Sequence, residues 1–137
     1  MSKITSCKAT SEWPGYPAHH AIDGDLGTVW NSGAFAPQSI EVELDKSSRE
    51  VTLGITPEMT PPFGDVTMEF LTINDDGHAL SKAQLTLPCQ TGVMEKVCLN
   101  PKEMDNEALG GRYNIKRIRI TFVSSPSWIA LRDIRIL

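Results

Sequence analysis

The segment Ile40-Glu41-Val42-Glu43-Leu44 alternates apolar and acidic side chains without interruption. Successive side chains of a strand point to opposite faces, so this alternation predicts a strand with one buried side and one side in water. The same period of two recurs in residues 51–55, 68–70 and 118–122, and more weakly in residues 85–87 and 93–99. No segment sustains a helical period. The chain is therefore expected to be all-β.

Two local features refine this prediction. The Asn74-Asp75-Asp76-Gly77 sequence is typical of a tight turn in which the glycine supplies a positive φ. Near the end of the chain, Ile129 and Leu131 share one parity, whereas Ile134 and Ile136 share the other. A change of parity within one strand predicts a β-bulge at Arg132-Asp133, because one inserted residue turns the following side chains to the opposite face.

Three long segments rich in proline, glycine and aromatic residues separate the expected strands, at residues 12–19, 31–38 and 56–65. Many short strands joined by turns indicate a β-sandwich or jelly roll. Connections between strands do not need this length, so these loops are the expected place of function. They carry Trp13, Tyr16, Phe35 and Phe63.

The composition limits the classes of protein. The 137 residues are expected to form one domain, residues 1–137, and no apolar run is long enough to cross a bilayer. The formal net charge of −4 argues against a nucleic-acid surface. Arg117, Arg119 and Arg135 are expected on the solvent side of two strands. Met1 and the residues after it form no signal core, so the chain is expected to be cytoplasmic, or secreted with its signal removed.

The three cysteines, Cys7, Cys89 and Cys98, cannot all pair, and they show no zinc spacing. Two interpretations stay open for them. In the first, Cys89 and Cys98 meet across a hairpin. In the second, which we favour, all three are small buried apolar residues.

The stretch Asp23-Gly24-Asp25-Leu26-Gly27-Thr28-Val29-Trp30 concentrates oxygen ligands on a tight turn. Calcium prefers several oxygens, some from carboxylates and some from carbonyls. The third acidic ligand and closing glutamate of an EF-hand do not follow. An acidic turn ending at a core tryptophan explains these residues equally well.

Four segments together resemble a discoidin domain, the coagulation-factor 5/8 type C family that includes the family 32 carbohydrate-binding modules. They are Ala9-Thr10-Ser11-Glu12, residues 21–25, Thr28-Val29-Trp30-Asn31-Ser32-Gly33 and residues 37–44. The closing residues 127–136 resemble the last strand of that family, so the match covers nearly the whole chain. The resemblance implies a jelly-roll sandwich of about eight antiparallel strands.

The resemblance also implies a structural calcium ion, since several members hold one between the Asp-Gly turn and the last strand. Carried onto this sequence, the ligands are oxygens of six residues, His20, Asp23, Asp25, Thr28, Arg132 and Asp133. For His20 and Arg132 the ligand is the backbone carbonyl. The family usually has glutamate in place of Asp133, and the shorter aspartate keeps the oxygen chemistry. The predicted bulge falls on the last two ligands.

Members of the family bind their ligands at the loop end of the sandwich. Galactose-binding members often have histidine where Asn31 stands, and arginine on the next long loop, which has none here. Galactose is therefore not assigned. A sugar presents an apolar ring face and a rim of hydroxyls, which aromatic and polar side chains recognise. The aromatic candidates are Trp13, Tyr16, Phe35, Phe63 and Trp128, and the polar candidates are Asn31, Glu58 and Asp65.

Several of these residues have a competing role. Trp30 and Trp128 are both expected in the core rather than in contact with a ligand, although Trp128 also stands near the last aromatic position of the family. Phe35 and Phe63 can equally pack the loops, and Glu58 and Asp65 can be ordinary solvated acids.

No nucleophile elbow, phosphate-binding glycine loop or catalytic triad pattern is present, so the chain is not expected to be an enzyme. The first hypothesis is a carbohydrate-binding module with structural calcium. The second is a discoidin domain that binds a protein partner, as intracellular relatives do. A hydrolase on a jelly roll is the least favoured.

Overall fold

The computed structural model describes residues 2–59, 63–101 and 114–137, with only the backbone described for Phe63 and Cys89. In the described part the chain forms nine strands and one short helical turn. The elements are β1 (Ile4–Ala9), η1 (Ala18–Ala21), β2 (Trp30–Asn31), β3 (Gln38–Ser48), β4 (Val51–Pro57), β5 (Phe63–Ile73), β6 (Ala79–Gln90), β7 (Glu95–Leu99), β8 (Ile115–Ser124) and β9 (Ala130–Ile136).

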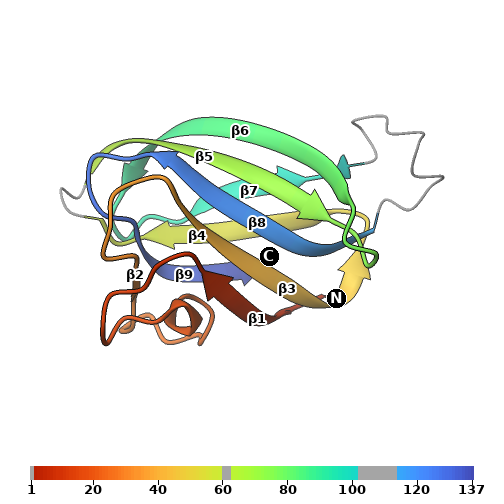
Figure 1. The fold of residues 1–137 in the computed structure, drawn as a ribbon, viewed down its shortest axis with the longest axis horizontal. Coiled ribbons are helices and arrows are strands. Elements are labelled where there is room, and N and C mark those ends of the chain that lie inside the picture. The colour runs from red at the N-terminus through yellow and green to blue at the C-terminus, as the bar shows by residue number, and fades with distance from the viewer. Residues whose placement is uncertain (1, 60–62, 102–113) are drawn as a thin grey trace.

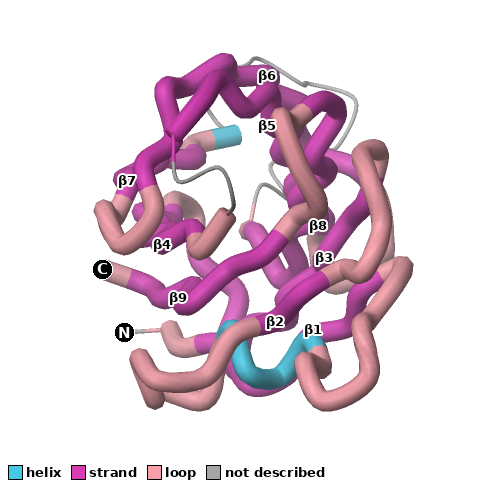
Figure 2. The backbone as a smooth tube through the Cα atoms, turned by 90° about the vertical axis from the view of Figure 1, so that its left-hand side faces the viewer, coloured by secondary structure: helices cyan, strands magenta, loops and turns pink. Residues whose placement is uncertain are grey.

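Two antiparallel sheets pack face to face as a sandwich. One sheet has the strand order β1-β3-β8-β5-β6, and the other has the order β2-β9-β4-β7. Figure 1 shows the five-stranded sheet in front of the four-stranded one, and Figure 2 shows the two layers from the end. The prediction of an all-β, antiparallel sandwich is confirmed. Among the described residues no helix is long and apolar enough to span a membrane.

The core lies between the sheets and follows the alternation seen in the sequence. Ile40, Val42 and Leu44 of β3 are fully buried, as are Ile118 and Ile120 of β8. The alternating residues of these strands face outward, because neighbouring Cβ atoms of a strand point to opposite faces. Arg119 lies outward on β8 opposite Glu41 in the register, and the two side chains form an ion pair at 3.0 Å.

The predicted bulge and turn are both present. In the pairing of β4 with β9, Thr56 lies opposite Asp133 and Pro57 lies opposite Leu131, so Arg132 is the extra residue. At the β5–β6 turn, the Asn74 side-chain oxygen accepts hydrogen bonds from the amides of Asp76 and His78, and Gly77 has a φ of 84°.

The loops differ from the sequence prediction in two places. The expected loop at residues 56–65 is shorter, because β4 continues to Pro57 and β5 begins at Phe63. The loop between β1 and β2 contains η1, a single helical turn that a search for helical periodicity does not detect. Its first amide, on Ala18, donates a hydrogen bond to the Glu12 carboxylate.

The favoured prediction that the cysteines are buried is wrong for Cys98. Its thiol is free, and its side chain is exposed because it lies on the face of β7 that points away from the core. Cys7 is partly buried against the core and is also free. Burial, together with the nearby negative charge of Glu12, raises the pKa of the Cys7 thiol to about 11. The side chain of Cys89 lies outside the described residues.

Candidate functional site

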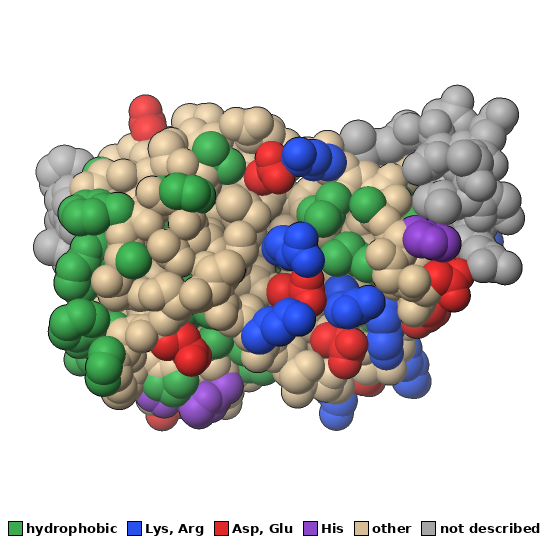
Figure 3. Space-filling view, viewed as in Figure 1, with side chains coloured by type: hydrophobic (Ala, Val, Ile, Leu, Met, Phe, Trp, Pro, Cys, Tyr) green, Lys and Arg blue, Asp and Glu red, His purple; other side chains and the backbone are tan. Residues whose placement is uncertain are grey.

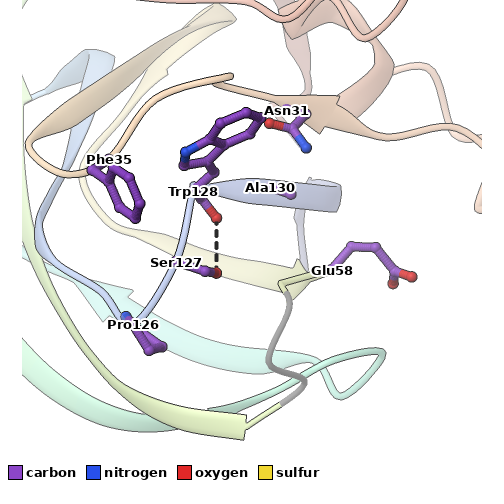
Figure 4. A pocket seen from close by; sticks show the side chains of 7 residues that line it. All are labelled: Asn31, Phe35, Glu58, Pro126, Ser127, Trp128 and Ala130. Carbon is purple, nitrogen blue, oxygen red and sulfur yellow. Dashed lines mark hydrogen bonds between the residues drawn. The ribbon is translucent and has the colours of Figure 1, made fainter.

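An open cleft of about 400 Å³ lies at the end of the sandwich where β2 leads toward β3 and β8 leads to β9. The lining residues come from β2, from β9, from the loops that follow β2 and precede β9, and from the residue that follows the end of β4: Asn31, Phe35, Glu58, Pro126, Ser127, Trp128 and Ala130. Figure 4 shows Phe35 and Trp128 on one side, Glu58 on the other, and Ser127 and Ala130 between them. The volume is within the range of roughly 300–1,000 Å³ of small-molecule sites.

Three aromatic rings form the apolar side of this end of the molecule. Phe35 and Trp128 meet edge to face, with ring centroids 6.4 Å apart, and the Trp13 ring packs against Trp128 at a centroid distance of 5.3 Å. Phe35 is 68% exposed and Trp128 is 37% exposed. Apolar side chains also gather at this end in the space-filling view, whereas charged side chains gather over the middle of the sheet and its other end (Figure 3). These rings therefore give this end of the molecule an exposed aromatic surface.

Backbone contacts place Trp13 beside the cleft. Its amide donates to the Asn31 carbonyl at 2.8 Å, and the Asn31 amide donates to the Tyr16 carbonyl at 3.2 Å. Gly33 has a φ of 65°, and a Cβ built there would lie 2.9 Å from the Trp13 ring. Only glycine accepts both this backbone conformation and this close approach.

The polar side of the cleft is formed by Asn31 and Glu58. The Asn31 side-chain oxygen accepts a hydrogen bond from the Gly33 amide at 2.8 Å. The Glu58 amide donates to the Ala130 carbonyl at 3.0 Å, which holds the residue against β9. The Glu58 carboxylate forms an ion pair with the Arg132 guanidinium.

The structure therefore brings together five of the eight predicted ligand residues: Trp13, Asn31, Phe35, Glu58 and Trp128. Tyr16 lies next to them, joined to Trp13 by backbone pairing, but does not line the cleft. Asp65 is exposed on β5, opposite Pro88, and is also absent from the lining. The side chain of Phe63 lies outside the described residues. Trp30, in contrast, is buried in the core, as expected, with its indole N–H donating to the Ser11 carbonyl. The expectation that Trp128 is also a core residue is wrong, because its side chain lies at the loop end of the sandwich and is 37% exposed.

Sequence reasoning missed the side chain of Arg132. It assigned only the carbonyl of this residue, to the metal site, and it noted the lack of an arginine on the third loop. The arginine at this end of the molecule comes instead from the bulge of β9. The bulge was visible in the sequence, but the pairing that brings β9 beside Glu58 was not.

The predicted calcium ligands of the Asp-Gly turn form a cluster of oxygens around the Thr28 hydroxyl. Its oxygen lies 2.6 Å from Asp23 Oδ2, 3.0 Å from the Asp25 carbonyl and 3.4 Å from the His20 carbonyl. Two amides support the turn, since those of Asp25 and Gly27 donate to the Asp23 and Asp25 carboxylates. A hydroxyl has one proton, so it satisfies only one of these three acceptors at a time.

Asp23 is exposed, and the small loss of solvent around its carboxylate raises its pKa, but opposing contributions outweigh this. Hydrogen bonds from the Thr28 hydroxyl and the Asp25 amide, and the charges of His20 and His19, hold this pKa below its usual value. Asp133 is only 3% exposed, and its carboxylate is paired with Arg135. Within the described residues, no three His, Cys, Asp or Glu side chains gather as metal ligands, so Asp23, Asp25 and Asp133 do not form such a group.

No protein-family model matches the chain, and no curated protein matches it. Solved structures do. The family 32 module of NanJ from C. perfringens, in complex with galactose, aligns with a TM-score of 0.71 and 20% identity, over 99% of this chain and 98% of that one. A pectin-binding module aligns with a TM-score of 0.66 and 18% identity, over 99% of this chain and 91% of that one.

The family 32 module of AlyQ, in complex with 4,5-unsaturated mannuronic acid, aligns with a TM-score of 0.69 and 19% identity, over 98% of this chain and 95% of that one. These neighbours are carbohydrate-binding modules. In a longer AlyQ structure such a module shares its chain with an alginate lyase domain, and this chain covers 32% of it. The chain therefore has the discoidin-like β-sandwich fold of the family 32 carbohydrate-binding modules.

Proposed function

We propose that this protein is a non-catalytic carbohydrate-binding module that holds a sugar in the cleft between Phe35 and Glu58. The observation that carries the proposal is the exposed Phe35–Trp128 pair on one side of a cleft that has polar groups on the other. A sugar ring has an apolar face and a polar rim, so it fits a site with these two sides.

The small residues between the two sides support a sugar over a protein partner. Ser127 and Ala130 have small side chains and leave room for a sugar ring, so the aromatic pair borders a concave cleft rather than a flat surface. A protein interface of standard size needs a broader surface, about 800 Å² on each partner. The three neighbours described above bind galactose, pectin or a mannuronic acid, which also favours a sugar. Their identity to this chain is too low to name which sugar.

We also infer that calcium binds at the Asp-Gly turn as a structural ion. The oxygens around Thr28 fit this ion because three of them compete for a single hydroxyl proton. A cation in contact with them relieves that competition and uses the charge of Asp23. The ligands from the turn are the carbonyls of His20 and Asp25, the carboxylate of Asp23 and the hydroxyl of Thr28.

Arg132 and Asp133 complete this proposed set from β9. The ion pair of Asp133 with Arg135 is compatible with a ligand role, because a carboxylate has two oxygens and only Oδ2 is paired with the guanidinium. The calcium ion supports the loop between β1 and β2 and takes no part in contacting the sugar.

Replacing Phe35 tests the sugar site. Phe35→Ala should weaken binding of the best ligand on a glycan array by about tenfold, equal to about 1.4 kcal/mol, because the exposed ring loses its contact with the sugar face. The melting temperature should stay nearly unchanged, since this ring is mostly in water. Titration calorimetry of the purified protein measures both binding constants.

Leu85→Ala is the matched control, because Leu85 is also an exposed apolar residue but lies on β6 and does not line the cleft. Binding that survives Phe35→Ala and Trp128→Ala unchanged contradicts the proposed site. Capture of no glycan at all contradicts the proposed function, and a protein partner then becomes the better hypothesis.

A further inference from the structure

Glu58 is the only ionisable residue among the described residues that line the cleft. The others are apolar or carry a neutral hydroxyl or amide. The one formal charge among these lining side chains is therefore this carboxylate. Figure 4 places Glu58 on the side opposite Phe35, with its carboxylate turned outward from the two aromatic rings, so the charge stands at the rim of the cleft.

Arg132 is the counter-charge of Glu58, and it lies outside the cleft lining. The two side chains are about equally exposed, at 32% and 31%. A pair that is partly withdrawn from water interacts more strongly than one on the open surface, because the local dielectric screens it less.

Neighbouring segments hold the Arg132 side chain beside Glu58. It projects from the bulge of β9, and its Nη1 lies near the β6–β7 turn, 3.8 Å from where a Cβ on Gly92 would stand. That turn is tied to the same region, because the Gly92 amide donates to the Pro57 carbonyl and the Thr91 hydroxyl donates to the Met59 carbonyl. The Nε atom of Arg132 is buried without a hydrogen-bond partner, so its guanidinium keeps unused donor capacity.

We propose that this pair sets the charge preference of the cleft, which takes neutral sugars and rejects uronic acids. Glu58 is the specificity-determining residue, and Arg132 is a positioning residue that also limits the net negative charge. The inference rests on the proposed function and deepens it by naming the class of sugar. A uronic acid brings a second carboxylate toward Glu58, and like charges in a partly buried site repel each other.

The two residues must then act in opposite directions. Glu58→Gln leaves the cation of Arg132 without its partner, so a uronic acid in the cleft is attracted by that charge and the preference reverses. Arg132→Gln leaves the carboxylate uncompensated, so the rejection of uronic acids becomes stronger. The double variant carries neither charge and should not discriminate. A merely structural role of the pair predicts equal losses for both classes of sugar.

Three matched pairs of sugars test this: galactose with galacturonic acid, glucose with glucuronic acid, and mannose with mannuronic acid. Each pair differs only in whether carbon 6 carries an alcohol or a carboxylate. Titration followed by NMR gives both dissociation constants for the pair whose neutral member binds best. The wild-type protein should bind the neutral sugar about tenfold more tightly, Glu58→Gln should prefer the acid, and the double variant should bind both within about twofold.

Glu69→Gln is the matched control, because Glu69 is also paired with a cation, Lys82 at 3.6 Å, but lies on the five-stranded sheet outside the cleft. This variant should leave the ratio of the dissociation constants for the uronic acid and the neutral sugar unchanged. Equal or tighter binding of the uronic acid by the wild-type protein overturns the inference while leaving the proposed function standing. An unchanged ratio in Glu58→Gln also overturns it, even if Arg132→Gln does not fold. Binding of none of the six sugars overturns this inference, whereas capture of no glycan on the array overturns the proposed function as well.

Discussion

At the scale of single residues, Gly33 decides whether the aromatic side of the cleft can form. It is the residue whose missing side chain lets Trp13 pack against the backbone, and Trp13 in turn supports Trp128. A neighbouring glycine, Gly15, has a similar positive φ of 89° but open space where its Cβ would be. Comparing alanine substitutions at Gly33 and Gly15 therefore separates the effect of backbone strain from the effect of a Cβ that collides with Trp13.

Gly33→Ala and Gly15→Ala should both lower the free energy of unfolding by roughly 1–2 kcal/mol, the cost of a left-handed backbone for a residue with a Cβ. Only Gly33→Ala should also weaken sugar binding, because its Cβ displaces the Trp13 ring. Urea denaturation and glycan titration of both variants measure the two effects. Equal loss of binding in both variants would contradict the role given to Trp13.

At the scale of elements, strand parity decides which side chains face water. Cys7 lies on β1 opposite Val42, whose side chain points into the core, whereas Cys98 lies on β7 opposite Thr52. The burial of the two thiols differs for this reason.

The two cysteines should therefore differ in reactivity, since the thiolate is the reactive form and the raised pKa of Cys7, about 11, leaves little of it at pH 8. In the folded protein at pH 8, iodoacetamide should label Cys98 quickly and Cys7 slowly. Mass spectrometry of the separated peptides resolves the two sites. Protein unfolded in urea is the control, in which both should react at similar rates, and equal rates in the folded protein would contradict the parity given to β1.

At the scale of the whole molecule, the proposed calcium ion joins the beginning and the end of the chain. The Asp-Gly turn follows η1, and η1 contacts β9, which carries the two further ligands. An ion that binds only the folded state stabilises it by mass action.

Calcium at 100 times its dissociation constant should stabilise the protein by about 2.7 kcal/mol, which raises the melting temperature by roughly 10 °C for a domain of this size. Asp23→Ala should remove the response, whereas Asp75→Ala, at an exposed acid of the β5–β6 turn, should keep it. Calorimetry with calcium and with chelator measures both. An equal response in Asp23→Ala would contradict the proposed ligand set.

The pH dependence of that response follows from the lowered pKa of Asp23. A carboxyl whose folded-state pKa lies below its unfolded value, about 3.9, contributes stability above that value. The contribution disappears as the pH falls through the folded-state pKa. The calcium response should therefore persist at pH 5 and disappear only in stronger acid, because the ligand carboxylate must be charged.

Much of the fold was predictable from the sequence by itself. The alternation around Ile40 and Ile118, the Asn74–Gly77 turn and the bulge at Arg132 are all local patterns, because the period of a strand and the φ of a glycine are properties of neighbouring residues. The grouping of the Asp23, Asp25 and Thr28 oxygens was also predictable, since a turn brings near residues together, whereas His20 was added only through the resemblance to the discoidin family. These local patterns predicted the sandwich, its inward faces and the clustering of Asp23, Asp25 and Thr28.

Only the tertiary structure decided the composition of the cleft. Phe35, Trp128 and Glu58 are far apart in the chain, and their meeting depends on how β2, β4 and β9 pair. The pairing of Glu58 with Arg132 depends on the same strand order and on the side to which the bulge turns one side chain. Contacts between distant residues follow from the packing of whole sheets, whose energy is shared over the entire core, and no local pattern in the chain records them.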